Sequence, residues 1–251
     1  MVGAVLALGG CGGNQASTPV TKPAVTVAAA ANLTEVFQQI GPQFEARTGI
    51  HPVFSFASTA QLTQQIENGA PFDVFAAADA THLADLDRKG LLLAGSRVVY
   101  ARGVLALWIP PGSQAHVARI QDLAASDVRF VAVAKPELAP YGEAAVEALR
   151  RLGLWEQVQP KIVYAENISM ARQYGQSHNA DAVFTAYSLV QHESGQVIRV
   201  EEAVHAPIDQ ELGILANSEH SREARQFADF LLHGEGRSTL LSYGYQLPGS
   251  Y

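Results

Sequence analysis

A strand, turn and helix unit that recurs along this chain constrains its fold more than any other feature. The first copy, AVTVAAAANLTEVF at residues 24–37, runs from β-branched residues through four small residues to Asn32. We predict that Asn32 caps a helix and that Glu35 completes a capping box. The first N–H groups of such a helix face the carboxyl end of the strand, where the helix dipole favours an anion. An Asn that only caps its own helix is the alternative.

The same unit is repeated in the rest of the chain, which favours a shared purpose for the turns. We predict further strands at residues 53–56, 73–78, 128–133, 162–164, 182–185 and 196–200, the last at a sheet edge, and helices after most of them. The first helix should end near Thr48-Gly49, and Asp79 should cap the helix after the third strand. Helices at residues 219–232 and 238–243 close the chain.

Strands that alternate with helices at this spacing indicate parallel βαβ units with right-handed crossovers. The apolar run 98–108 is broken at Arg102-Gly103, where we expect the chain to enter a second lobe, and Ile214-Leu215 should mark its return. We therefore predict an α/β fold with two lobes, each a mostly parallel sheet flanked by helices. The expected division is residues 1–23 as signal and tether, 24–104 with 206–251 as lobe I, and 105–205 as lobe II.

The opening segment contains the single cysteine, Cys11, after an apolar run that is too short to span a bilayer. The run reads as the apolar region and cleavage site of a secretory signal. Its end, Leu-Gly-Gly-Cys, resembles the lipobox of bacterial lipoproteins, which implies that Cys11 carries a lipid anchor. An ordinary secretory signal with an incidental cysteine is the alternative. Both readings place the protein outside the cytoplasm, with residues 12–23 as a flexible tether.

Four turns between a predicted strand and a predicted helix, two in each lobe, form the candidate site. In open α/β sheets, ligands bind beyond the carboxyl ends of the strands, where these turns would meet if the lobes face each other. The turns contain no Lys or Arg, so they offer backbone N–H groups, an amide and hydroxyls. Hydrogen bonds to a charged acceptor contribute roughly 1.5–3 kcal/mol each, so several can hold a dianion. The turns are residues 31–32, 58–59, 140–142 and 167–169.

Composition and missing motifs exclude several classes of function. The formal net charge of −7 without a basic cluster argues against nucleic acid. The nucleophile elbow, P-loop, dinucleotide fingerprint and His-Glu-x-x-His motifs are missing, so we predict no catalytic residues, no cofactor and no metal site made of protein ligands. A phosphate carrying a proton would need an acceptor, and Glu166 is the acid beside a turn that is not readily explained as a cap. An organic acid would usually call for an Arg fork.

Motifs along nearly the whole chain resemble those of periplasmic molybdate-binding proteins, the solute receptors of molybdate ABC importers. They are AAAANL, SFASTAQL followed by QIENGAPFDVFAAAD, then PELAPYGEAA and AENISMA. The resemblance implies a type II periplasmic binding fold whose lobes close on molybdate or tungstate. A receptor for sulfate or phosphate, and an enzyme or regulator on the same fold, are the alternatives.

The resemblance also implies the contacts and partners. We expect a monomer that is anchored to the membrane through Cys11 and delivers its anion to an ABC permease. Thr185 stands where some members of the family place a contacting Tyr. The oxyanion contacts carried over by motif are Asn32, Ser58 or Thr59, Tyr141 and the backbone of Ile168, and Thr185 would be a fifth position.

Overall fold

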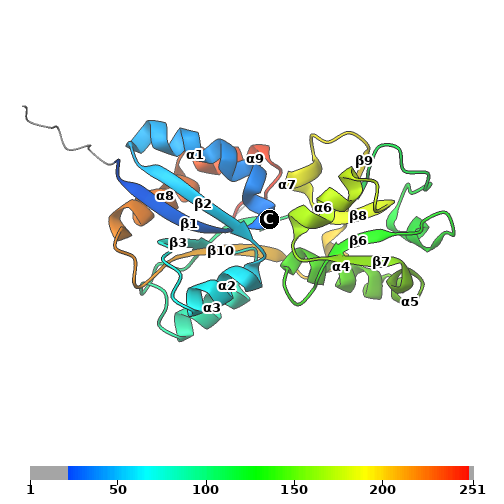
Figure 1. Ribbon diagram of the computed structural model, residues 1–251, viewed down its shortest axis with the longest axis horizontal. Coiled ribbons are helices and arrows are strands. Elements are labelled where there is room, and N and C mark those ends of the chain that lie inside the picture. The colour runs from blue at the N-terminus through cyan, green and yellow to red at the C-terminus, as the bar shows by residue number, and fades with distance from the viewer. Residues whose placement is uncertain (1–21, 249–251) are drawn as a thin grey trace, which may run out of the picture.

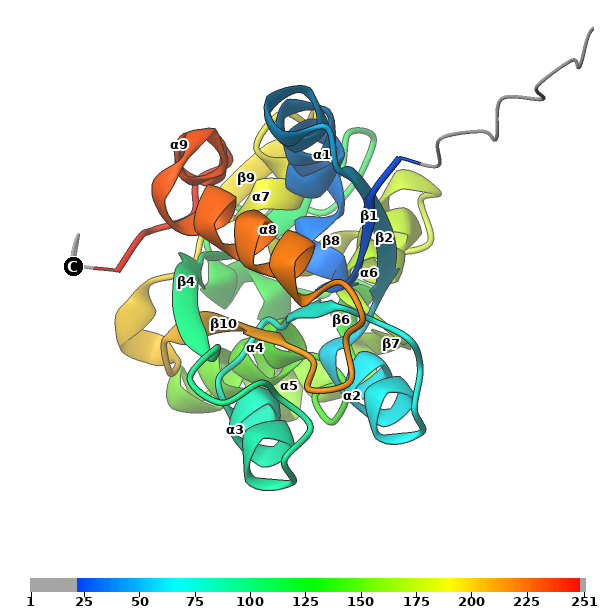
Figure 2. The same cartoon turned by 90° about the vertical axis from the view of Figure 1, so that its left-hand side faces the viewer.

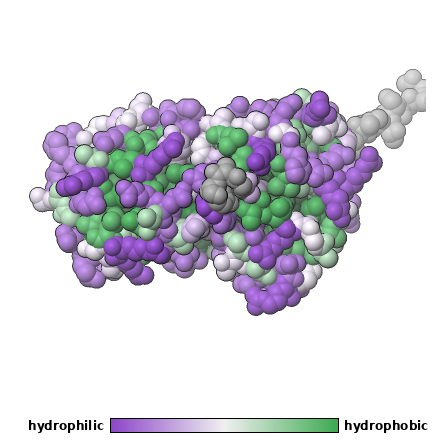
Figure 3. All heavy atoms as spheres, turned by 180° about the vertical axis from the view of Figure 1, so that it is seen from behind, coloured by the Kyte–Doolittle hydropathy of each residue, from purple (hydrophilic) through white to green (hydrophobic). Residues whose placement is uncertain are grey.

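The computed structural model describes residues 22–248, so Cys11 lies outside the described residues. Two lobes lie side by side, and each is a five-stranded sheet between two layers of helices (Figure 1). No helix among residues 22–248 is both long enough and apolar enough to cross a membrane. On the face seen in Figure 3, apolar residues lie among polar ones on both lobes, so surface hydropathy alone does not single out a site.

The first lobe contains the beginning and the end of the described chain. Its elements are β1 (Ala24–Ala30), η1 (Ala31–Leu33), α1 (Thr34–Thr48), β2 (His51–Ala57), α2 (Thr59–Glu67), β3 (Val74–Ala76), α3 (Thr81–Arg88), β4 (Val98–Gly103), β10 (Ile208–Ile214), α8 (Ser221–His233) and α9 (Glu235–Ser242). The strand order is β2-β1-β3-β10-β4. Helices α1, α8 and α9 cover one face of this sheet, and α2 and α3 cover the other (Figures 1 and 2).

The second lobe is formed by the middle of the chain. Its elements are β5 (Leu105–Ile109), η2 (Ile120–Ala124), β6 (Val131–Ala134), α4 (Pro140–Arg151), α5 (Trp155–Val158), η3 (Gln159–Lys161), β7 (Ile162–Ala165), α6 (Ile168–Gln176), β8 (Ala182–Ala186), α7 (Tyr187–Val190), β9 (Gln196–Arg199) and η4 (Glu202–Val204). The strand order is β7-β6-β8-β5-β9, with β9 at the predicted edge. Helices α6 and α7 lie on one side of the sheet and α4 and α5 on the other (Figure 1).

The two sheets repeat one plan. In each, the first strand of the unit pairs in parallel with the second and the third, as β1 does with β2 and β3, and β6 with β7 and β8. The remaining pairings, made by β10 with β3 and β4 and by β5 with β8 and β9, are antiparallel. The α/β fold class is confirmed, and each sheet is mixed because one strand, β10 in the first lobe and β5 in the second, runs against the other four.

A buried aspartate occupies the same place in each sheet, and in the second sheet it explains why one strand begins later than predicted. The carboxylate of Asp73, before β3, accepts the Thr26 N–H of β1 at 2.7 Å. The carboxylate of Asp181, before β8, accepts the N–H groups of Arg129 and Phe130 at 2.8 and 3.0 Å, so β6 begins at Val131 rather than at residue 128. Backbone groups that a carboxylate satisfies do not need a partner strand.

The chain crosses between the lobes where the long apolar run is broken. Strand β4 ends at Gly103 and β5 begins at Leu105, so the first crossing is at residue 104 as the break at Arg102-Gly103 predicts. The return was predicted at Ile214-Leu215 and is earlier, because β10 already pairs with β4 from Ile208 onward. The lobe limits proposed from the sequence stay a prediction, although the strands of each sheet fall within them.

Candidate functional site

The first predicted turn lies at the junction of the lobes but is built differently from the prediction. Asn32 is inside η1, and no side chain caps either η1 or α1. The predicted capping box is therefore wrong. Glu35 instead accepts a hydrogen bond from Arg172 of the second lobe at 2.9 Å. The Asn32 amide is 1% exposed and donates both of its protons at 3.0 Å, to Gln210 Oε1 and to the Tyr245 hydroxyl.

The second turn begins α2 and contains two hydroxyls that make different hydrogen bonds. Ser58 is the N-cap, forms a capping box with Gln61, and donates its own proton to Gln61 Oε1 at 2.8 Å. The Thr59 hydroxyl accepts the Ala78 N–H at 3.2 Å, and no described residue accepts its proton. The N–H of Ala60 reaches across to Leu138 O of the second lobe at 3.2 Å. Thr59 thus keeps a free donor at the lobe junction, whereas Ser58 does not.

The third turn places a phenol at the same junction. Pro140 begins α4, which suits the first helical position because that residue needs no N–H. Tyr141 follows, is 2% exposed, and accepts a hydrogen bond from Gln210 Nε2 at 2.9 Å. Burial raises the pKa of Tyr141 well above the usual value for a phenol, so the hydroxyl remains a neutral donor near neutral pH. A Cβ on Gly142 would lie 2.1 Å from Ala134 O, so the helix start sits tightly against the end of β6.

The fourth turn begins α6 and touches the first lobe. Asn167 caps the helix by accepting the Met170 N–H at 3.0 Å, so the side chain of Asn167 faces its own helix. The N–H groups of Ile168 and Ser169 lie in the first turn of the helix, where no helical carbonyl is available to them, so they need another acceptor. The Ser169 hydroxyl donates to Ala31 O of η1 at 3.0 Å. The first and fourth turns are therefore in direct contact.

Thr185 lies inside the second lobe on the α6 side of its sheet. It shares a sheet face with Val183, and a Cβ added to Gly175 of α6 would lie 2.7 Å from the Val183 side chain. Thr185 is fully buried, and its hydroxyl has no hydrogen-bond partner among the described residues. A buried hydroxyl without a partner is uncommon and points to a water or a ligand beside it.

Sequence reasoning missed the residues that join the first and third turns. Gln210 of β10 is fully buried and receives or donates hydrogen bonds with Asn32, Tyr100 and Tyr141. The Tyr245 hydroxyl donates to Asn32 O at 2.9 Å and lies 3.1 Å from the Ser188 hydroxyl. The only signal for Gln210 in the PIDQELGIL run is its place two residues from Ile208 and from Leu212, where period-two alternation predicts an apolar residue.

Basic side chains beside the turns are already paired with carboxylates. Lys135, which precedes the third turn, forms an ion pair with Glu166, and this contact raises the pKa of Lys135. Arg172 of α6 is held by Glu35 and by Leu189 O at 3.0 Å. Glu166 was considered as an acceptor for a protonated anion, and its ion pair with Lys135 accounts for it instead. The four turns therefore present uncharged donors.

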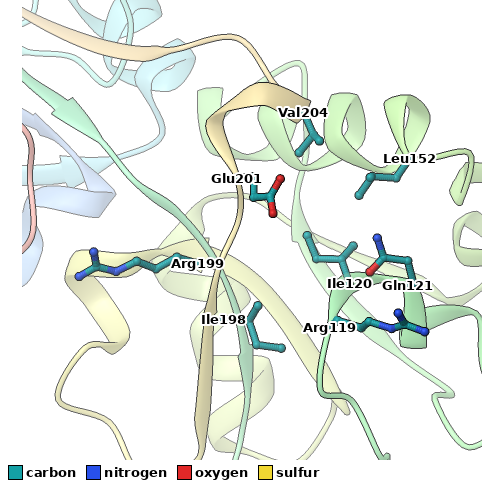
Figure 4. Close-up of a pocket in the computed structure, with 8 residues that line it drawn as sticks. All are labelled: Arg119, Ile120, Gln121, Leu152, Ile198, Arg199, Glu201 and Val204. Atoms are coloured by element: carbon teal, nitrogen blue, oxygen red, sulfur yellow. The ribbon is translucent and has the colours of Figure 1, made fainter. Parts of the chain in front are cut away.

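Two cavities lie on either side of the lobe junction. One, of about 300 Å³, is lined from the first lobe by residues 78–81 and 206–209 and from the second by the start of α4. The other, of about 270 Å³, is lined by Glu35, Arg172, Ser188 and neighbouring residues. A smaller notch of about 130 Å³ lies within the second lobe, where the side chains of Arg119 and Arg199 point away from its centre (Figure 4). None of these three cavities is lined by the predicted contact residues, which are Asn32, Ser58, Thr59, Tyr141, Ile168 and Thr185.

The comparisons with known proteins all match substrate-binding proteins. A family model described as bacterial extracellular solute-binding protein matches residues 25–246. The chain is similar to the molybdate-binding protein ModA of Rhodobacter capsulatus, at 36% identity over 231 residues that cover 90% of each chain. It is also similar to a putative ABC transporter substrate-binding lipoprotein, YvgL of Bacillus subtilis, at 28% identity over 246 residues, covering 96% of this chain and 94% of that protein. The structure resembles the periplasmic molybdate-binding protein of Azotobacter vinelandii, with a TM-score of 0.84 and 31% identity, covering 89% and 99% of the two chains.

Gly103 tests how tightly the crossing and the third turn fit together. A Cβ at this position would lie 2.0 Å from the Tyr141 hydroxyl oxygen and 2.6 Å from Gln210 Nε2. We expect Gly103→Ala to lower the free energy of unfolding in urea by about 1–3 kcal/mol, as overpacked sites do. Tyr141→Phe removes the nearest atom, so Gly103→Ala should lower the free energy of unfolding less in the Tyr141→Phe background than in the wild type. Costs that simply add would contradict the proposed contact.

Proposed function

This chain belongs to the bacterial extracellular solute-binding proteins, in one family with the molybdate-binding ModA proteins, and we propose that it is the receptor of an ABC importer. It captures molybdate or tungstate outside the cytoplasm and delivers the anion to the membrane permease. The observation that carries this proposal is the meeting of four strand-to-helix turns, two from each lobe, at one junction without an unpaired basic side chain. The motifs and the relatives favour molybdate over the alternative anions sulfate and phosphate.

The structure favours particular atoms as anion contacts. Thr59 and Tyr141 each accept one hydrogen bond from the protein and retain a hydroxyl proton, which an anion can accept. Ile168 offers its backbone N–H at the start of α6. Both amide protons of Asn32 are used by Gln210 and Tyr245, which favours the backbone N–H of Asn32 as its contact.

The other two predicted residues take different places in the proposal. Ser58 uses its hydroxyl proton within the capping box, so its proposed role is to hold the start of α2. The unpartnered hydroxyl of Thr185 supports a contact with the anion or with a water that the anion retains. The bound group is a complete oxyanion, so the protein supplies hydrogen bonds to its oxygens and no ligand to the metal itself.

Uncharged donors suit a dianion that carries no proton. Each hydrogen bond to a charged acceptor contributes roughly 1.5–3 kcal/mol, and each helix start adds the positive end of its dipole. These donors are fixed by burial before the anion arrives, so little ordering remains to oppose binding. The basic side chains beside the turns are already paired with Glu166 and Glu35, so they are not free to hold the anion.

Closure of the lobes would complete the site. The contacts across the junction include Ser169 with Ala31 O at 3.0 Å and Ala60 N with Leu138 O at 3.2 Å. The links between the lobes are the single residue between β4 and β5 and the segment 200–207, both suited to a hinge. An anion that both lobes contact shifts the population toward the closed form, which the permease would recognise.

We also propose a lipid anchor on Cys11 and action as a monomer. The Leu-Gly-Gly-Cys sequence and the similarity to a relative named as a lipoprotein support the anchor. Metabolic labelling with a radioactive fatty acid should mark the wild-type protein and not Cys11→Ser.

Calorimetric titration with four anions tests the function. We expect molybdate and tungstate to bind with a Kd of about 1 μM or lower, and sulfate and phosphate to bind more weakly. Tight binding confined to sulfate or phosphate would replace the proposed ligand, and the absence of binding by all four would overturn the proposal.

Thr59 and Ser58 provide a matched pair of hydroxyl substitutions. We expect Thr59→Val to weaken molybdate binding roughly 10- to 150-fold, because it removes one donor to a charged acceptor. Thr59→Ser keeps the hydroxyl and should retain most of the affinity. Ser58→Ala should mainly lower the free energy of unfolding, by about 1 kcal/mol, because it removes a helix cap. The reverse ranking of Thr59→Val and Ser58→Ala in a titration would contradict the assignment.

A further inference from the structure

Gln210 is the residue through which the two lobes share a buried hydrogen-bond network. It lies on β10 of the first lobe, is fully buried, and donates from Nε2 to the Tyr141 hydroxyl of the second lobe at 2.9 Å. Its Oε1 accepts from the Asn32 amide at 3.0 Å and from the Tyr100 hydroxyl at 2.9 Å. The Asn32 amide nitrogen can only donate, so it fixes Gln210 Oε1 toward Asn32 and leaves Gln210 Nε2 toward Tyr141.

The direction of the Gln210 amide decides what Tyr141 can offer. A phenol has one proton and can accept as well as donate. Because Gln210 Nε2 donates to the Tyr141 oxygen, the Tyr141 proton is left to point away from Gln210, and no described residue accepts it. If the side-chain amides of Gln210 and Asn32 were both flipped, the Tyr141 hydroxyl would donate to Gln210 and would present a lone pair to the junction instead.

We propose that Gln210 determines the specificity of the site by holding the Tyr141 hydroxyl as a donor toward the bound anion. This inference rests on the proposed function and adds a rule for choosing among oxyanions. A fully ionised anion such as molybdate, tungstate or sulfate accepts from every donor in the site. Monohydrogen phosphate has the same charge as these anions but carries a proton, and a site that contains only donors leaves that proton without an acceptor.

The phenols of the network support this role because they stay protonated. Burial raises the pKa values of Tyr100, Tyr141 and Tyr245. The network is therefore neutral at ordinary pH, and its hydrogen-bond directions do not change by titration of these groups. Gln210 acts as a positioning residue that needs no contact of its own with the anion.

The test replaces Gln210 with a side chain of similar size that cannot hydrogen-bond. In Gln210→Met, the Tyr141 hydroxyl is free to turn and can accept the proton of phosphate. We expect molybdate binding, measured by calorimetry at about pH 8, to weaken roughly 2- to 10-fold. In competition against molybdate, the affinity for phosphate should rise several-fold relative to that for sulfate. Phosphate at this pH is mainly a dianion, as sulfate is, so a general change in the charge of the site should affect the two anions alike.

Two further variants show that the effect passes through Tyr141. Tyr141→Phe removes the hydroxyl, and in that background Gln210→Met should have little additional effect on molybdate binding. Gln39→Met changes an exposed glutamine of α1 in the same way and should bind like the wild type. If Gln210→Met does not fold, as judged by its thermal transition, Gln210→Leu takes its place in the same comparison.

The outcomes separate this inference from the proposed function. Wild-type protein that binds none of the anions overturns the proposed function and this inference with it. Wild-type protein that binds molybdate, with a Gln210→Met variant that shows no gain of phosphate relative to sulfate, overturns the role of Gln210 alone. Additive effects of Gln210→Met and Tyr141→Phe would also overturn it, because they would assign Gln210 a separate structural part.

Discussion

The structure depends on a polar junction that is buried between two lobes and must therefore satisfy its own donors and acceptors. Asn32, Tyr100, Tyr141 and Gln210 are each at most 2% exposed. A buried polar group without a partner costs about 1–3 kcal/mol, so the directions of these hydrogen bonds are closely constrained by one another. Protons that remain after the internal bonds are made are the ones available to a ligand. In this protein those protons belong to the hydroxyls of Thr59, Tyr141 and Thr185 and to the N–H groups at the starts of helices.

A repeated α/β plan brings those protons together. Each lobe sends the carboxyl ends of two parallel strands, and the helix starts that follow them, toward the other lobe. The same repetition places a buried aspartate at the opposite end of each sheet, Asp73 in one and Asp181 in the other, where it satisfies backbone N–H groups. The four turns contain no Lys or Arg. The oriented dipoles at their helix starts attract an anion instead.

Much of this arrangement could be predicted from local sequence patterns. The spacing of apolar residues predicts the strands and helices, and the small and polar residues between them predict the turns. Both patterns are local, because they depend only on residues that are close in the sequence. That Asn32 does not cap its helix could not be predicted, because Asn-x-x-Glu reads the same in a cap and inside a 3₁₀ turn. What decides between the two is contact with Gln210 and Tyr245, which are 178 and 213 residues away in sequence. The same distance hides the importance of Gln210.

A crystal structure of the tungstate complex, with the metal located by its anomalous scattering, tests the central claim most directly. The account predicts one tungsten peak between η1 and the starts of α2, α4 and α6, with the oxygens around it within hydrogen-bonding distance of the Thr59 and Tyr141 hydroxyls and the Ile168 N–H. A peak elsewhere, or an anion held chiefly by the side chain of Lys135 or Arg172, would contradict it.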